Sequence, residues 1–144
     1  MFLLDDIDFV QTQSFPVSDL WYFLPIGYLF TILIETPILL VGLPRKLSFK
    51  QKLLCGIWLT ACTYPIVILV LPTLFFGESR TLYLIVAETF APVAECVLFW
   101  LVIRRIESMS GADWVISFIV ITIANLASFV LGELMNAYEW FGVL

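Results

Sequence analysis

The sequence predicts an all-α protein, a compact four-helix transmembrane bundle in which consecutive helices are antiparallel neighbours. Hydrophobic residues make up 62% of the 144 residues and charged residues only 13%, whereas soluble domains contain about 25% charged residues. The apolar residues form four runs, at about 20–43, 51–76, 80–103 and 112–136. Each run is close to the ~20 residues that a helix needs to cross a ~30 Å hydrocarbon core. Because the linkers are short, we expect residues 1–144 to form a single membrane domain.

The basic residues predict the orientation of this bundle, because Lys and Arg in short loops stay on the cytoplasmic side of a membrane. Six of the seven basic residues fall in or beside the linkers after the first and third runs: Arg45, Lys46, Lys50, Lys52, Arg104 and Arg105. Both linkers are therefore predicted to be cytoplasmic, with the N- and C-termini on the other side of a cell membrane or an internal membrane. The segment before the first run is acidic and lacks a basic region, so we expect this run to remain as an anchor.

Charge and residue usage exclude several classes of function. A net charge of -5 argues against a nucleic-acid partner. The chain contains no histidine, so no Ser-His-Asp triad and no His-bound zinc can form, and the sequence does not predict an enzyme. Cys55, Cys62 and Cys96 lie within apolar runs, away from the aqueous outer face where disulfides usually form, and are predicted to be free thiols.

Each apolar run carries a polar residue at a similar depth. Glu35 of the first run and Glu95 of the third lie about three residues, or ~4.5 Å, to the cytoplasmic side of the helix middle. Thr63 of the second run and Asn125 of the fourth lie close to the middle. Glu88 lies on the outer side of the midplane, seven residues before Glu95, so both carboxylates project from nearly the same face of one helix, ~10 Å apart. Each of the four helices is therefore expected to place a polar group at one depth.

Prolines reinforce the expectation that these groups face the bundle interior. Pro92 removes the hydrogen bond that the main-chain carbonyl of Glu88 would accept, and Pro37 and Pro65 free carbonyls in the first and second runs. In lipid such a carbonyl is tolerated when a neighbouring helix, a hydroxyl, a water or a bound cation satisfies it.

Two hypotheses explain carboxylates at this depth, where no Lys, Arg or His is available and a charge costs at least ~2.5–3.5 kcal/mol. The glutamates are either protonated hydrogen-bonding groups that join helices, or they are ionised around a cation. Carboxylate, amide and hydroxyl oxygens are ligands of hard cations. The predicted ion site, for a proton or a divalent metal as cofactor, comprises Glu35, Thr63, Glu88, Glu95 and Asn125, with Glu35 and Glu95 as the metal ligands.

The fourth run also predicts close packing. Ala124, Ser128 and Gly132 recur every four residues and form a ridge of small side chains, which favours close helix contact. Glu133 and Asn136 lie near the outer end of this run, where we expect them to have a surface role.

The polar positions of the first three runs resemble a pattern in a group of small, uncharacterised bacterial membrane proteins, cyanobacterial ones among them. The positions that carry this resemblance are Glu35-Thr36-Pro37, Thr63-Tyr64-Pro65, and Ala87-Glu88 with Glu95. The resemblance implies the same compact four-helix bundle with glutamates inside the membrane, and it implies no activity.

Two functions are consistent with these expectations. The first is a cation-binding membrane protein, acting as a transport-related subunit. The second is an accessory or assembly subunit of a larger membrane complex, such as an energy-transducing or photosynthetic one, in which the glutamates are structural. Because four helices without an internal repeat are few for a transporter, both hypotheses predict a homo-oligomer or a subunit of a larger complex in the lipid bilayer.

Overall fold

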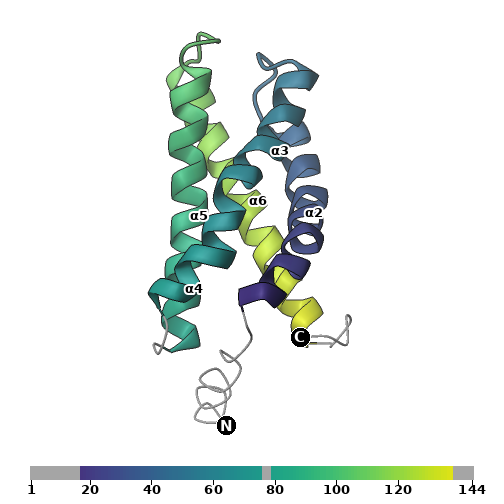
Figure 1. The fold of residues 1–144 in the computed structure, drawn as a ribbon. Coiled ribbons are helices and arrows are strands. Elements are labelled where there is room, and N and C mark those ends of the chain that lie inside the picture. Colours follow the sequence, from purple (N-terminus) through teal and green to yellow (C-terminus); the bar gives the residue numbers. More distant parts are fainter. Residues whose placement is uncertain (1–16, 76–78, 138–144) are drawn as a thin grey trace.

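The computed structural model describes residues 17–75 and 79–137, and all the regular secondary structure in this part of the chain is helical. The elements are α2 (Val17–Gly42), α3 (Phe49–Pro65), the π-helix η1 (Ile66–Val70), α4 (Leu71–Leu74), α5 (Arg80–Ile103) and α6 (Gly111–Ala137). Helices α3, η1 and α4 follow one another directly and form one bent rod (Figure 1). Four helical segments are therefore long and apolar enough to cross a membrane, as predicted: Leu24–Gly42, Phe49–Leu74, Thr81–Ile103 and Gly111–Met135.

Serine caps define where the helices begin. Ser48 caps α3, because its hydroxyl accepts from the Gln51 main-chain N–H at 3.3 Å while the Gln51 side chain accepts from the Ser48 N–H at 2.7 Å. Ser110 and Asp113 make the same reciprocal pair at the start of α6, at 3.2 and 2.9 Å. Each pair satisfies two main-chain donors that a helix N-terminus otherwise leaves without partners.

The two linkers that carry most of the basic residues lie side by side at one end of the bundle, shown at the top of Figure 1. The ammonium group of Lys46 lies 3.0 Å from the Asp113 carboxylate and donates to the Ser108 carbonyl at 3.2 Å. Gln51 donates to the Glu107 carboxylate at 3.1 Å. The start of α3 is thereby joined to the segment that links α5 and α6. We call this end of the molecule the loop end.

Lys52 has a structural role that the sequence analysis did not assign to it. Its side chain is only 8% exposed, and its ammonium group donates to the main-chain carbonyls of Leu43 at 2.6 Å and Leu40 at 3.2 Å. These carbonyls belong to the last turn of α2 and the residue after it, where four carbonyls lack helical partners and a positive charge is favoured. Lys52 therefore caps α2 from α3.

A π-helix and a proline lie where the second span bends, and a tyrosine of the third span compensates for a missing hydrogen bond. In the π-helix the N–H of Leu71 bonds to the Ile66 carbonyl, five residues earlier. The next bond of this pattern would join residue 72 to Val67, but Pro72 has no N–H to donate. The hydroxyl of Tyr83, on α5, donates to the Val67 carbonyl at 3.1 Å instead. A side chain of the third span thus satisfies a carbonyl that the proline leaves free.

The large side chains divide into a buried core and an apolar outer surface. The core gathers towards the loop end and includes Leu39, Leu43, Leu59, Phe99 and Ile121. Large apolar side chains also point outwards on every span, among them Val41 at 88% and Leu33 at 72% exposed. Helices that are apolar on all faces are typical of membrane spans.

A close approach between two helices occurs at a glycine of α3 that the sequence did not indicate. A methyl group added at Gly56 of α3 would lie 2.5 Å from the hydroxyl oxygen and 3.1 Å from the Cα of Thr36 on α2. At Gly132 an added methyl group would meet no atom of the described residues within 4 Å. Ala124 is buried and Ser128 is half-buried, so the first part of the predicted small-residue ridge is packed, whereas Gly132 meets no described neighbour. Helical spacing alone does not show where along such a ridge a neighbouring helix comes close.

This difference gives a paired test with opposite signs. Gly56→Ala is expected to lower the free energy of unfolding by about 1–3 kcal/mol, because α2 and α3 must move apart. Gly132→Ala is expected to leave stability unchanged or to raise it by up to ~1 kcal/mol, through the higher helix propensity of alanine. Thermal denaturation of both variants in one detergent measures the difference. Equal losses at the two positions would contradict the packing described here.

Candidate functional site: a buried pair of glutamates

Two glutamates lie at the centre of the bundle, one on α2 and one on α5. Glu35 and Glu95 are each only 2% exposed. Both lie inside the apolar segments that are long enough to cross a membrane. Burial of a carboxyl group requires hydrogen-bond partners, because an unpaired polar group in an apolar interior costs several kcal/mol. Helices α3 and α6 supply those partners.

Glu35 of α2 is held between α3 and α6. One carboxyl oxygen, Oε2, accepts from the Thr60 hydroxyl of α3 at 2.9 Å. The other, Oε1, accepts from the Ser128 hydroxyl of α6 at 2.7 Å. A single side chain therefore links three helices through two short hydrogen bonds.

Glu95 of α5 is held in the same manner by different residues of the same two helices. Its Oε1 accepts from the Thr63 hydroxyl of α3 at 2.8 Å. Its Oε2 accepts from the Asn125 side-chain amide of α6 at 2.7 Å. We refer to Glu35, Thr60, Thr63, Glu95, Asn125 and Ser128 as the glutamate cluster.

Helical spacing explains why two helices each serve both glutamates. Thr60 and Thr63 are three residues apart on α3, and Asn125 and Ser128 are three residues apart on α6, so each pair lies on one helix face. Each face presents one partner to the glutamate of α2 and one to the glutamate of α5. All four carboxyl oxygens of the cluster therefore have a protein partner.

The hydroxyl groups of the cluster have a choice of acceptor, because each has one proton and two acceptors in reach. The Thr60 oxygen lies 2.9 Å from Glu35 and 2.8 Å from the main-chain carbonyl of Gly56. Thr63 and Ser128 likewise have a carboxyl oxygen and a carbonyl of their own helix in reach. When a hydroxyl donates to the carbonyl, its oxygen can accept a hydrogen bond from a protonated carboxyl group. The hydroxyls thus fit both protonation states of the glutamates.

Asn125 removes this freedom at one oxygen. Its amide has two hydrogens and donates to Glu95 Oε2 at 2.7 Å and to the Ile121 carbonyl at 3.0 Å at the same time. Oε2 is thereby always an acceptor, so a protonated Glu95 carries its proton on Oε1, facing Thr63. A protonated Glu35 can carry its proton on either oxygen, because both face hydroxyls.

No basic side chain balances these carboxyl groups. In the described part of the chain neither Glu35 nor Glu95 pairs with Lys or Arg, and the ion pair between Lys46 and Asp113 lies at the loop end. Within residues 17–75 and 79–137, no group of three or more His, Cys, Asp or Glu side chains is placed to hold a metal ion. The donors around the two glutamates are neutral hydroxyl and amide groups.

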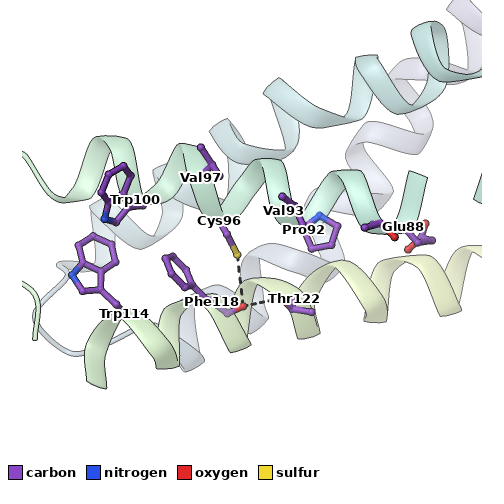
Figure 2. Close-up of a pocket in the computed structure, with 10 residues that line it drawn as sticks. Glu88, Pro92, Val93, Cys96, Val97, Trp100, Trp114, Phe118 and Thr122 are labelled. Carbon is purple, nitrogen blue, oxygen red and sulfur yellow. Dashed lines mark hydrogen bonds between the residues drawn. The ribbon is translucent and has the colours of Figure 1, made fainter. Parts of the chain in front are cut away.

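The structure brings together four of the five residues predicted for the ion site and separates the fifth. Glu35, Thr63, Glu95 and Asn125 belong to the glutamate cluster. Glu88 is half-buried and lies at one end of a groove between α5 and α6 (Figure 2). It takes no part in the hydrogen bonds of the cluster. About two turns of α5 separate Glu88 from Glu95. The two glutamates share a helix face, but they do not share hydrogen-bond partners.

Sequence reasoning missed two members of the cluster. Thr60 was not selected, and Ser128 was assigned to helix packing alone. The signal that could have found them is the spacing of three residues from Thr63 and from Asn125, which puts each on the face of a residue already selected.

The remaining predictions concern cysteines and the outer end of α6. Cys55, Cys62 and Cys96 are free, as predicted. Glu133 is half-buried and takes part in an interaction, whereas the side chain of Asn136 lies outside the described residues.

Comparison with known proteins gives no match: no protein-family model, no curated protein and no solved structure resembles the chain significantly. The resemblance to small bacterial membrane proteins stays a prediction, and the functional argument rests on the glutamate cluster.

The amide of Asn125 provides a test of the cluster. Asn125→Leu keeps a similar volume but leaves Glu95 Oε2 without its donor, so the free energy of unfolding is expected to fall by about 1–3 kcal/mol. Ser117→Ala is the control, because Ser117 is buried on the same helix and donates at 2.8 Å to the Asp113 carbonyl of its own helix. Thermal denaturation in one detergent compares the two. A loss for Asn125→Leu no larger than that for Ser117→Ala would contradict the role given to the amide.

Proposed function

We propose that the chain is a multi-pass membrane subunit whose glutamate cluster binds protons. The observation that carries this proposal is that all four oxygens of Glu35 and Glu95 meet neutral protein donors inside apolar helices, with no basic partner among the residues that the structure describes. Two uncompensated negative charges at this depth are costly. One proton on each carboxyl group removes that cost, and the hydroxyl groups around them can accept hydrogen bonds from the protonated carboxyl groups without any movement of the helices.

The geometry supports a proton more strongly than a divalent metal. A metal ion needs several oxygen ligands that point at one centre. Asn125 instead directs its amide nitrogen, a donor, at Glu95, and this nitrogen cannot serve as a ligand of a hard cation. Metal binding by Glu35 and Glu95 would require Asn125 to turn and the hydroxyl protons of Thr60, Thr63 and Ser128 to leave the carboxylates.

The proposed orientation follows the positive-inside rule. We place the loop end, with Arg45, Lys46, Lys50, Arg104 and Arg105, on the cytoplasmic side, and both termini on the opposite side. Consecutive spans are then antiparallel. The capping role of Lys52 does not weaken this assignment, because five other basic residues belong to the same end.

A transport-related role for a single proton site requires further protein subunits. A single bundle of four helices provides one proton site and no repeat with which to alternate its access, so we propose that the protein acts as a homo-oligomer or within a larger membrane complex. The saturated hydrogen bonds of the cluster also favour a second candidate, an accessory subunit in which the glutamates only join helices. The two candidates differ in whether the glutamates exchange protons in the folded protein.

Stability across pH tests whether Glu35 and Glu95 bind protons in the folded protein. If the folded protein holds protons on Glu35 and Glu95 more tightly than the unfolded chain, the melting temperature falls as pH rises and the folded site loses its protons. The double variant Glu35→Gln, Glu95→Gln cannot lose them, so its melting temperature is expected to be independent of pH over that range. Glu107→Gln, at the loop end, is expected to behave as wild type.

The same measurement with added chelator tests the metal alternative. We expect no change in the melting temperature of wild type with chelator, because a proton-binding site contains no metal ion for the chelator to remove. Parallel pH curves for wild type and the double variant would contradict proton binding, and a chelator-induced loss in wild type alone would favour a metal.

A further inference from the structure

A groove of about 750 Å³ runs along the outer side of the α5–α6 contact (Figure 2). Trp100 of α5 and Trp114 of α6 line the end of the groove nearest the loop end, and Glu88 lies at the other end. Val93 and Val97 line its wall and are 58% and 50% exposed. The groove therefore opens outwards, to the surface that faces lipid in a membrane.

Positive charge gathers at the tryptophan end of the groove. The Arg104 guanidinium lies 4.0 Å from the centre of the Trp100 ring, so Trp100 both lines the groove and holds Arg104 above it. Arg105 is the next residue, and both arginines are exposed. Neither appears in an ion pair within the described part of the chain. The positive charges of Arg104 and Arg105 are thus available near the tryptophan end of the groove.

We propose that this groove binds one acyl chain of an anionic phospholipid, whose phosphate headgroup contacts Arg104 and Arg105. Anionic headgroups attract basic residues at the membrane surface, and tryptophans at this level mark the boundary between headgroups and hydrocarbon. The chain would enter between Trp100 and Trp114 and run along α5 past Val97 and Val93.

The length of the groove agrees with this occupant. Trp100 and Glu88, at the two ends of the groove, are twelve residues apart, or ~18 Å along the helix, slightly more than the ~15 Å hydrocarbon depth of one leaflet. A chain that starts at Trp100 in the loop-end leaflet therefore ends ~3 Å before the level of Glu88. The carboxyl group is therefore not in the path of the acyl chain.

The experiment measures which lipids stay with the protein. The full chain is reconstituted in nanodiscs that contain equal amounts of phosphatidylglycerol and phosphatidylcholine, then purified in mild detergent, and the retained lipids are quantified by mass spectrometry. We expect phosphatidylglycerol to be enriched over phosphatidylcholine. Arg104→Gln and Arg105→Gln are each expected to lower the enrichment about fivefold. Lys50→Gln removes the same charge at the loop end, on α3, and is expected to keep it.

Two tryptophan variants test the groove itself. Val97→Trp places a large side chain in the groove and is expected to reduce the retained lipid. Ile123→Trp adds the same bulk at a position of α6 that is 51% exposed and outside the groove lining, and is expected to retain lipid as wild type does. Both positions are on the outer surface, and equal melting temperatures will verify that both variants fold.

Four outcomes would overturn the proposal. Equal retention of the two lipids would exclude headgroup recognition, and an equal loss with Lys50→Gln would show attraction to the loop end as a whole. Unchanged retention by Val97→Trp would show that the chain lies elsewhere. A lipid-free dimer that Val97→Trp dissociates would show that a second copy of the protein occupies the groove.

Discussion

The cost of burying a carboxyl group among apolar helices governs the arrangement at the centre of this molecule. Across residues 17–75 and 79–137, Glu35 and Glu95 have no basic partner, so their oxygens must meet donors from neighbouring helices. Those donors come from α3 and α6, which brings all four spans to one level. In lipid, where helix association lacks a hydrophobic driving force, such hydrogen bonds and close packing hold helices together. The close approach of Thr36 and Gly56 lies one residue along α2 from Glu35 and supports the same contact.

The two ends of the bundle are built differently. At the loop end, Lys46, Gln51 and Lys52 connect the first two spans to each other and to the linker between α5 and α6. Towards the other end, the second span contains a π-helix and Pro72, and Tyr83 supplies a hydrogen bond that the main chain lacks. π-Helical segments and prolines are frequent where helices bend or adjust. The glutamate cluster lies between the loop end, where hydrogen bonds join the spans, and the segment of the second span that contains η1 and Pro72.

The sequence predicted the four spans to within a few residues, because hydropathy and length determine spans almost independently of tertiary contacts. It also predicted that Glu35, Thr63, Glu95 and Asn125 meet, since their depth follows from position along each helix. The partners of individual oxygens could not be predicted, because they depend on helix rotation and crossing. For that reason Thr60 and Ser128 were missed, and neither the separation of Glu88 from the hydrogen bonds of the cluster nor the close contact at Gly56 was predicted. The burial of Lys52 was missed because the positive-inside rule counts a basic residue beside a linker in the same way whether its side chain is exposed or caps a helix.

The central claim is that the two buried glutamates are neutral in the folded protein, and infrared spectroscopy measures this directly. A protonated carboxyl group has a C=O stretching band that is separate from the bands of a carboxylate. At neutral pH, wild type is expected to show this band, Glu35→Gln and Glu95→Gln are each expected to lose part of it, and the double variant is expected to lose both parts. A wild-type spectrum in which the Gln substitutions remove only carboxylate bands would show that the glutamates are ionised and would contradict the account.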